Sequence, residues 1–198
     1  MPVCAKKLKD KQYILFLGRL SIEKGIYVID EIIYRILKQY PNLYFVFAGL
    51  ITVNDGKRID EQIKRSAAEY KERVVFSGVV PRGELVYLIQ NADFVVMPSV
   101  RDNFPNACAE AMDEGKLIIG TDGSSLEQFI IDGYNGLLAK PDDAESLYQK
   151  IAQAMSMDQT NKHKIESNAK EWVKRWNIED YSMKMEKMYK KIIPCEWM

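Results

Sequence analysis

The chain has 198 residues and a mass of 22.9 kDa, with 47% hydrophobic and 28% charged residues. This ordinary globular composition excludes collagen, low-complexity disorder and a disulfide scaffold, and the length favours one domain. The net charge is zero, whereas a nucleic-acid binder usually carries a basic surplus, so we expect no nucleic acid as a partner. The charge is unevenly placed, since residues 91–145 hold 3 Lys/Arg against 11 Asp/Glu.

The compartment is suggested by the cysteines and by the start of the chain. Cys4, Cys108 and Cys195 lie far apart and match no metal spacing, and so sparse and odd a set fits a reducing compartment. Residues 1–11 are rich in lysine and lack the apolar stretch of a secretory signal. No stretch reaches the roughly 18 apolar residues of a membrane span. We therefore expect a cytoplasmic protein with a leader or linker over residues 1–12.

Short apolar runs alternate with longer amphipathic segments along most of the chain. Such alternation predicts a parallel sheet covered by helices on both faces, a Rossmann-like doubly wound α/β fold of about six strands with a helical C-terminal tail. Strands are expected at 13–17, 43–48, 74–77, 94–97, 117–119 and 137–139, and helices at 26–40, 59–70, 83–90, 106–114, 126–131, 143–155, 162–175 and 180–193.

Small residues follow five consecutive expected strands, at Gly18, Gly49, Gly78, Ser99 and Gly120. In a doubly wound sheet, ligands bind outside the carboxyl ends of the strands. Bare backbone at those ends would let a ligand approach closely. The alternative is that glycine only eases the turn from each strand into the next helix.

The first candidate site is the segment from Gly18 to Gly25, Gly-Arg-Leu-Ser-Ile-Glu-Lys-Gly. It is neither a P-loop nor a GxGxxG turn. Ser21 is expected to cap the following helix, which would place Lys24 in its first turn, where a cation opposes the helix dipole by roughly 0.3–1 kcal/mol. Arg19 and Lys24 together would suit a diphosphate. The alternative is two solvated surface cations.

The second candidate site is the segment 98–112, where the fourth strand ends and a helix begins near Pro105. Asp102 lies just before that helix and Glu110 lies about a turn and a half inside it. Carboxylates beside an anion site are explained if they accept hydrogen bonds from a sugar diol. The alternatives are a glycosidase acid–base pair, or a capping aspartate with a solvent-facing glutamate.

Two further features have ordinary structural interpretations. The loop after the fifth strand, residues 120–127, opens a short helix, and Ser124 or Ser125 is expected to be its N-cap with Glu127 in the first turn. His163 is the single histidine and lies in the helical tail, far from every strand end, so no catalytic role is expected for it.

Several spaced motifs, in order, resemble the C-terminal, donor-binding half of a GT-B fold glycosyltransferase of family 4. Residues 18–25 resemble the GR(L)xxxKG loop of that family, and residues 75–78 (Val-Phe-Ser-Gly) resemble its VxFxG strand. Residues 102–112 resemble its E-x7-E element with the EAM that follows, and residues 133–138 resemble its DGxNGxL turn. The resemblance runs from about Tyr13 to the end of the chain.

The resemblance implies a role for individual residues. Arg19 and Lys24 would bind the donor diphosphate, and Glu110 would bind the ribose. Asp102 would reach the donor sugar, although the family has a glutamate there and Asp is one methylene shorter. Of these, Arg19, Lys24 and Asp102 would be catalytic. The remaining donor contacts would come from Gly18, from the main chain at Gly78, Val79 and Val80 near the base, and from backbone N–H groups at Asn103, Phe104 and Asn106.

The resemblance also implies what the chain does and what it lacks. It would be the nucleotide-sugar-binding half of a retaining enzyme that transfers a hexose to a glycan or a lipid-linked acceptor, with no metal and no other cofactor. Residues 13–179 would form this domain, and residues 180–198 would pack on a missing N-terminal acceptor domain. The whole enzyme would contact the inner face of a membrane. A non-catalytic binding module is the alternative, and a dinucleotide oxidoreductase is disfavoured by the absent GxGxxG.

Overall fold

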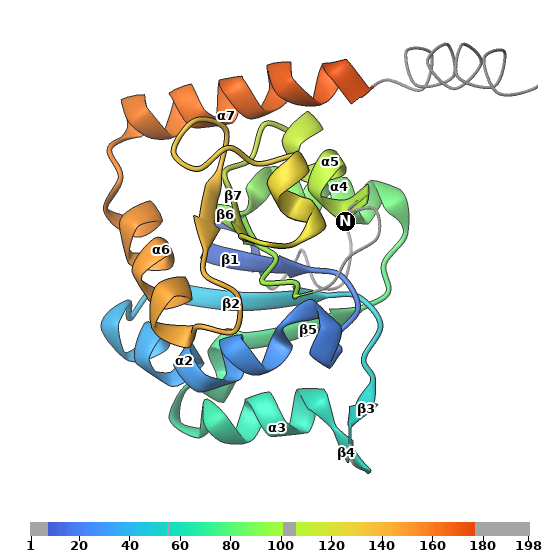
Figure 1. Ribbon diagram of the computed structural model, residues 1–198. Coiled ribbons are helices and arrows are strands. Elements are labelled where there is room, and N and C mark those ends of the chain that lie inside the picture. Colours follow the sequence, from blue (N-terminus) through green and yellow to red (C-terminus); the bar gives the residue numbers. More distant parts are fainter. Residues whose placement is uncertain (1–7, 55, 101–105, 177–198) are drawn as a thin grey trace, which may run out of the picture.

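A six-stranded parallel sheet runs through the centre of the computed structural model, with helices packed on both of its faces (Figure 1). The structure describes residues 8–54, 56–100 and 106–176. The strand order across the sheet is β5-β2-β1-β6-β7-β8. The strands are β1 (Gln12–Leu17), β2 (Leu43–Ala48), β5 (Val74–Gly78), β6 (Phe94–Val96), β7 (Ile118–Thr121) and β8 (Leu137–Ala139).

The strands form where the sequence is continuously apolar, because both faces of the sheet are covered. In β1 every residue after Gln12 is buried, and in β2 only Tyr44 is not fully buried. Side chains of alternate residues enter opposite layers: Phe45 and Phe47 stack at 4.9 Å in one layer, whereas Val46 belongs to the other. The six expected strands are all present, with ends shifted by at most two residues.

The helices divide into two layers. The helices α2, α3 and α6 bury their apolar faces in one hydrophobic cluster, and α4, α5 and most of the loop after β7 bury theirs in the other. The helix α7 packs along α5 (Figure 1). The helices are α2 (Ile26–Gln39), α3 (Ile59–Ser66), α4 (Arg82–Asn91), α5 (Asn106–Asp113), α6 (Ala144–Ser156) and α7 (Gln159–Val173).

The strand order reverses direction between β1 and β6. From β1 the chain proceeds outward through β2 to β5, then returns to place β6 on the other side of β1 and continues through β7 to β8. At such a topological switch point, loops from neighbouring strands lead to opposite faces and leave a crevice at the carboxyl ends. The loops after β1 and β6 are those that hold the first two candidate sites.

The structure corrects several expected helices. The helix expected at 59–70 ends at Ser66 and is followed by the 3-10 turns η2 (Ala68–Arg73), whose Arg73 guanidinium donates to the carbonyls of Leu37, Tyr40 and Leu43. The segment expected at 126–131 is only the 3-10 turn η3 (Ser125–Gln128). The helix α7 begins before residue 162 because the side chain of Asp158 caps it.

A small hairpin was not expected, and the tail is not described. Two-residue strands β3 (Val53–Asn54) and β4 (Lys57–Arg58) pair antiparallel after β2. The expected helix at 180–193 lies outside the described residues, as do residues 1–7 of the expected leader. Of the helices in the described ranges, none has the length and apolar composition needed to cross a bilayer.

Candidate functional site

The floor of the candidate site consists of bare backbone at the carboxyl ends of β1, β2 and β5. The Gly18 N–H donates to the Ala48 carbonyl at 3.0 Å, and the Gly49 N–H donates to the Gly78 carbonyl at 2.9 Å. A Cβ atom at Gly49 would lie 1.9 Å from the Gly18 carbonyl oxygen, so no larger residue fits there. Glycine is therefore required at position 49 by the close approach of the Gly18 backbone, whereas a Cβ atom at Gly18 itself would meet nothing within 4 Å.

The loop after β1 carries Arg19 and Lys24. It is anchored by the fully buried Leu20, whose N–H donates to the Leu50 carbonyl at 2.9 Å. Residues Ile22–Lys24 form the 3-10 turn η1, in which Lys24 is half-buried, while Arg19 is exposed. The loop thus presents two cations within six residues at the edge where the strands end.

Two details of this loop differ from expectation. The Ser21 side chain makes no capping hydrogen bond, and the residue before α2 is Gly25 in the left-handed conformation (φ +66°). Lys24 therefore lies ahead of α2 and not in its first turn. A contact between distant parts of the chain accounts for this difference. Gly25 packs against the backbone of Pro98, just after β6, and the turn η1 brings Gly25 to that position.

The Ser21 hydroxyl serves a neighbouring carboxylate instead. Its hydrogen bond to Glu23, together with a backbone hydrogen bond, holds the pKa of the Glu23 carboxyl below its ordinary value, and the charges of Arg19 and Lys24 act in the same direction. Glu23 is fully exposed and stays ionised at neutral pH. An anionic ligand bound by the two cations would have this carboxylate beside it.

The loop after β6 meets the loop after β1 at the switch point. The Val100 N–H donates to the Glu23 carbonyl at 3.0 Å, and Ser99 is buried. The structure therefore brings the Arg19–Lys24 loop next to the segment that leads to α5. Asp102, Asn103 and Phe104 follow Val100 directly and lie outside the described residues.

The carboxylate of Glu110 lies between α4 and α5. Glu110 is half-buried on α5 and lines a small hollow with Arg82 and Leu85 of α4. Asn106, the first residue of α5, is exposed. The hollow runs along α4 from Arg82, four residues after Gly78, to Ile89 near the end of the helix. Val79, which follows β5 directly, is 74% exposed.

Arg82 is a candidate that the sequence analysis missed. It lies in the first turn of α4, where a cation opposes the helix dipole, the same signal that drew attention to Lys24. Arg82 lines the same hollow as Glu110 because α4 and α5 pack side by side, and this packing is not visible in the sequence.

The third candidate loop has the structural role expected of it. The Ser124 hydroxyl accepts from the Leu126 N–H at 3.2 Å and so caps η3, and the Glu127 carboxylate accepts from the Gly123 N–H at 3.1 Å. His163 is exposed on α7 and pairs with Glu166 of the same helix. Within the described ranges, no cluster of His, Cys, Asp and Glu is arranged to hold a metal ion.

Comparison with known proteins decides the family. Residues 5–172 match the family described as glycosyl transferases group 1. The chain belongs to this family. A relative is the uncharacterized glycosyltransferase MJ1178 of Methanocaldococcus jannaschii, 26% identical over 92% of this chain and 49% of its own length. The chain spans about half the length of the curated relatives it matches.

Solved structures have the same fold, either as a separate C-terminal domain or over half of a longer chain. The C-terminal domain of a group 1 glycosyl transferase from Francisella tularensis superposes with a TM-score of 0.75 and 24% sequence identity. The match covers 89% of this chain and 95% of that domain. Anabaena HepE in complex with UDP-glucose superposes with a TM-score of 0.80 and 20% sequence identity. The match covers 94% of this chain and 50% of HepE. The Rossmann-like domain is thus one half of a GT-B fold, as expected from the sequence.

Proposed function

We propose that this glycosyltransferase chain is the donor-binding half of a retaining enzyme. It binds a nucleoside-diphosphate sugar, and the whole enzyme transfers the hexose to a glycan or a lipid-linked acceptor. The observation that carries the proposal is the meeting of the two loops at the switch point, where Glu23 and Val100 join the cationic segment to the segment of Asp102. The UDP-glucose complex of the similarly folded HepE supports a nucleotide sugar as the ligand.

The two cations provide the diphosphate site in this proposal. Arg19 binds phosphate oxygens as a planar fork and Lys24 as a point charge, at the crevice where doubly wound sheets hold nucleotides. The space beside Gly18, where a Cβ atom would meet nothing within 4 Å, leaves room for the ligand to lie against the main chain. Both cations act without a metal ion or another cofactor.

The nucleoside and the sugar occupy the two ends of the diphosphate. Glu110 accepts hydrogen bonds from the ribose hydroxyls, near the main chain of Gly78, Val79 and Val80 that meets the base. Asp102 contacts the donor sugar, and backbone N–H groups at Asn103, Phe104 and Asn106 assist. Arg19, Lys24 and Asp102 are the groups nearest the bond that breaks.

A partner domain completes the enzyme in this proposal. The chain spans about half of its relatives, which supports an N-terminal half that binds the acceptor. By itself, the chain binds donor and transfers little. The second candidate function, a binding subunit that works with a separate acceptor-binding chain, is favoured by the same observation.

The test is a binding panel on the full 198-residue chain. UDP-, GDP- and ADP-sugars are each added at about 100 times their dissociation constants, where a ligand stabilises the fold by about 2.7 kcal/mol. A rise in the melting temperature with one nucleotide class supports the proposal, and calorimetric titration then gives its affinity. No response to any of them contradicts donor binding, and a response to NAD(H) alone would favour an oxidoreductase.

A further inference from the structure

The start of α4 is held firmly by backbone contacts. Pro81 restricts the backbone just before the helix, and its carbonyl accepts from the N–H groups of Glu84 and Leu85, both at 3.0 Å. Arg82, the first residue of the helix, follows the end of β5 at Gly78 by four residues. The fold therefore sets the backbone position of Arg82, and its exposed side chain is free to adjust to a ligand.

The Arg82 side chain lies near three carboxylates without pairing with any of them. Arg82 lines the hollow between α4 and α5, and the carboxylates of Glu110, Asp113 and Glu114 line the same hollow. Among residues 8–54, 56–100 and 106–176, none forms an ion pair or a hydrogen bond with the Arg82 guanidinium. Its five N–H groups are therefore available to a ligand.

The register of the two helices places Arg82 relative to Glu110. Both helices run in the same direction, because each returns from a strand of the same parallel sheet. Near their C-terminal ends, the Gln90 amide of α4 donates to the Glu114 carboxylate of α5 at 2.7 Å. Glu110 lies four residues before Glu114, about 6 Å nearer to the strand exits along the helix axis. Arg82 lies eight residues before Gln90, about 12 Å nearer, and so about one helical turn beyond Glu110 toward the exits.

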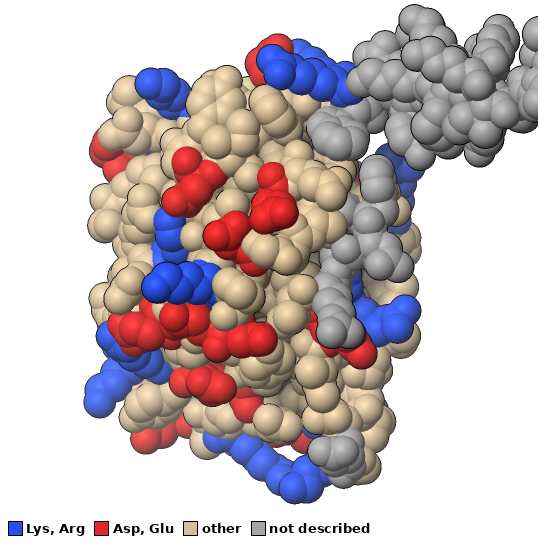
Figure 2. All heavy atoms as spheres, viewed as in Figure 1, with Lys and Arg blue, Asp and Glu red and all other residues tan. Residues whose placement is uncertain are grey.

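The charges in this hollow favour an uncharged part of a ligand. Three carboxylates lie beside one guanidinium, so the net charge of the lining is negative and repels a phosphate. Acidic side chains also gather on the face that carries α2 and α6 (Figure 2). A diphosphate would instead find its counter-charges at Arg19 and Lys24, in the loop after β1. Of a bound nucleotide, the part beside Arg82 is thus the ribose or the base.

The base is the part that would extend past Glu110 toward Arg82. In the proposed function, Glu110 holds the ribose hydroxyls and the main chain of residues 78–80 meets the base. Arg82 follows Val80 with a single residue between them, and it lies on the side of Glu110 that faces the strand exits. Since the base is bonded directly to the ribose, the Arg82 guanidinium would reach the edge of the base that points away from the sugar.

A guanidinium distinguishes bases by the groups on that edge. It has five donors and no acceptor, so it hydrogen-bonds to a carbonyl oxygen and not to an amino group. Uracil and guanine carry a carbonyl on the edge away from the sugar, whereas cytosine and adenine carry an amino group at the equivalent position. Main-chain groups offer one donor and one acceptor per residue, so they bind bases of either class. The side chain of Arg82 is the group that can tell them apart.

We propose that Arg82 is a specificity-determining residue that selects the base of the donor, favouring uracil or guanine over cytosine or adenine. The Arg82 guanidinium donates to the carbonyl oxygen of the base, while Glu110 holds the ribose one helical turn away. The proposal rests on the donor-binding function and deepens it, because it assigns the choice of nucleotide to one side chain.

The test compares nucleoside diphosphates that share the ribose and the diphosphate: UDP with CDP, and GDP with ADP. Isothermal titration calorimetry on the full 198-residue chain gives each dissociation constant. A correct base contact gives about 5- to 150-fold discrimination, so UDP should bind at least about fivefold more tightly than CDP, or GDP than ADP. Arg82→Ala should abolish this preference, mainly by weakening the binding of UDP or GDP.

Further variants separate the shape of the side chain from its charge. Arg82→Lys keeps the charge but loses the planar fork, so it should keep only part of the preference. Arg82→Gln, which has both a donor and an acceptor, should lose the preference and serves if Arg82→Ala fails to fold. Arg65→Ala removes an exposed arginine from α3, in the other helix layer, and should leave all four dissociation constants unchanged. Melting temperatures of all variants check that the fold is intact.

The outcomes separate this proposal from the donor proposal. If Arg82 had only a structural role, or bound the diphosphate, Arg82→Ala would weaken all four nucleotides by the same factor, and that result would overturn the proposal. A wild-type chain that binds all four equally or prefers CDP or ADP would also overturn it, as would a preference that Arg82→Ala retains. In each of these cases nucleotides still bind, so the donor proposal stands. Absence of binding by all four nucleotides would contradict the donor proposal and this one with it.

Discussion

Gly25 lies so close to Pro98 that a Cβ atom on the glycine would stand 1.8 Å from the proline carbonyl oxygen. Gly25 also has φ of +66°, a conformation that other residues adopt only at a cost. This contact joins the loop after β1 to the end of β6, where the hydrogen bond from Val100 to Glu23 continues it. The two loops are positioned by packing of their backbones, before any ligand binds.

Gly25→Ala should therefore damage both stability and donor binding. The added methyl group would force the two loops apart in addition to the strain of positive φ, so we expect a loss of more than about 4 kcal/mol in the free energy of unfolding. The matched control is Gly133→Ala, with φ of +73° and open space around the position, which should lose only about 1–2 kcal/mol. Urea denaturation measures the free energy of unfolding of both variants. Equal losses would show that the contact with Pro98 is not a constraint.

Arg19→Ala and Lys24→Ala should each weaken binding of nucleoside diphosphates without unfolding the chain. A charge-assisted hydrogen bond contributes roughly 1.5–3 kcal/mol, so the dissociation constant for UDP should rise roughly 10- to 150-fold. Arg65→Ala removes an exposed cation from α3 and should leave the affinity as it was. Isothermal titration calorimetry provides the measurement. Wild-type affinity in both site variants would refute the diphosphate assignment.

Replacing the carboxylates of Glu110 and Asp102 by neutral amides should affect ligand binding in two different ways. Glu110→Gln exchanges an all-acceptor group for a mixed one and should weaken UDP and UDP-glucose alike, by roughly 1–2 kcal/mol. Asp102→Asn should spare UDP and weaken only UDP-glucose. Glu31→Gln, which neutralises an exposed carboxylate on α2 in the other helix layer, is the control. Parallel titrations with the two ligands test the division, and equal losses of both ligands in the two variants would contradict it.

The fold was predictable from the sequence because strands covered on both faces are continuously apolar. The strands at Leu43–Ala48 and Leu137–Ala139 have the expected ends. The hairpin at Val53–Arg58 was missed since its strands are two residues long and largely exposed. The 3-10 turn before Gly25 was missed for another reason: it follows from contact with Pro98, 73 residues away, which local sequence preferences do not reveal.

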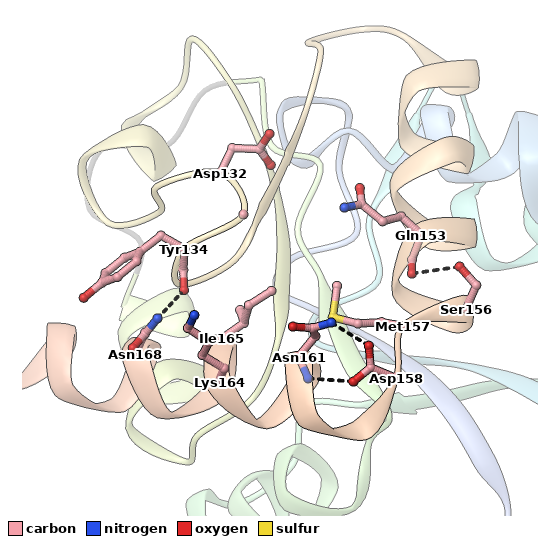
Figure 3. A pocket seen from close by; sticks show the side chains of 11 residues that line it. Asp132, Tyr134, Gln153, Ser156, Met157, Asp158, Asn161, Lys164, Ile165 and Asn168 are labelled. Atoms are coloured by element: carbon pink, nitrogen blue, oxygen red, sulfur yellow. Dashed lines mark hydrogen bonds between the residues drawn. The ribbon is translucent and has the colours of Figure 1, made fainter.

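The candidate site was predictable only in part, for the same reason. The strand exit and a cation expected in the first turn of a helix pointed to Arg19 and Lys24, although the structure places Lys24 ahead of α2. Arg82 carries the same kind of signal, but its importance depends on Glu110 lying across the hollow between α4 and α5. The hollow of about 660 Å³ between the turn before β8 and the junction of α6 and α7 has no signal in the sequence, because its lining residues come from three separate segments (Figure 3).

Asp60 should make stability depend on pH in the acidic range. Although burial of this carboxyl opposes its ionisation, the hydrogen bonds from Arg58 and the charges of Arg58 and Lys64 outweigh it and lower the pKa of Asp60 from 3.8. A lowered folded-state pKa means that the stabilisation is complete above pH 3.8 and is lost as the pH falls below the folded value. Asp60→Asn should thus be less stable than wild type at pH 7. The difference should shrink toward pH 2 in urea melts, and a difference independent of pH would exclude an ionic origin.

The last prediction concerns the proposed N-terminal partner domain. Residues 180–193 were expected to form a helix with Tyr181, Met185, Met188, Tyr189 and Ile192 at helical spacing, and they lie outside the described residues. An apolar stripe of this length usually packs against another surface. We expect the isolated chain to bind donor and transfer little hexose, and hydrogen exchange across 180–193 to be faster than when a partner domain covers the stripe. An N-terminal GT-B half from a relative, added in trans, should slow exchange there and permit transfer. Strong protection of these amides in a dilute monomer would show that the stripe packs within this chain, and that it has no need of a partner domain.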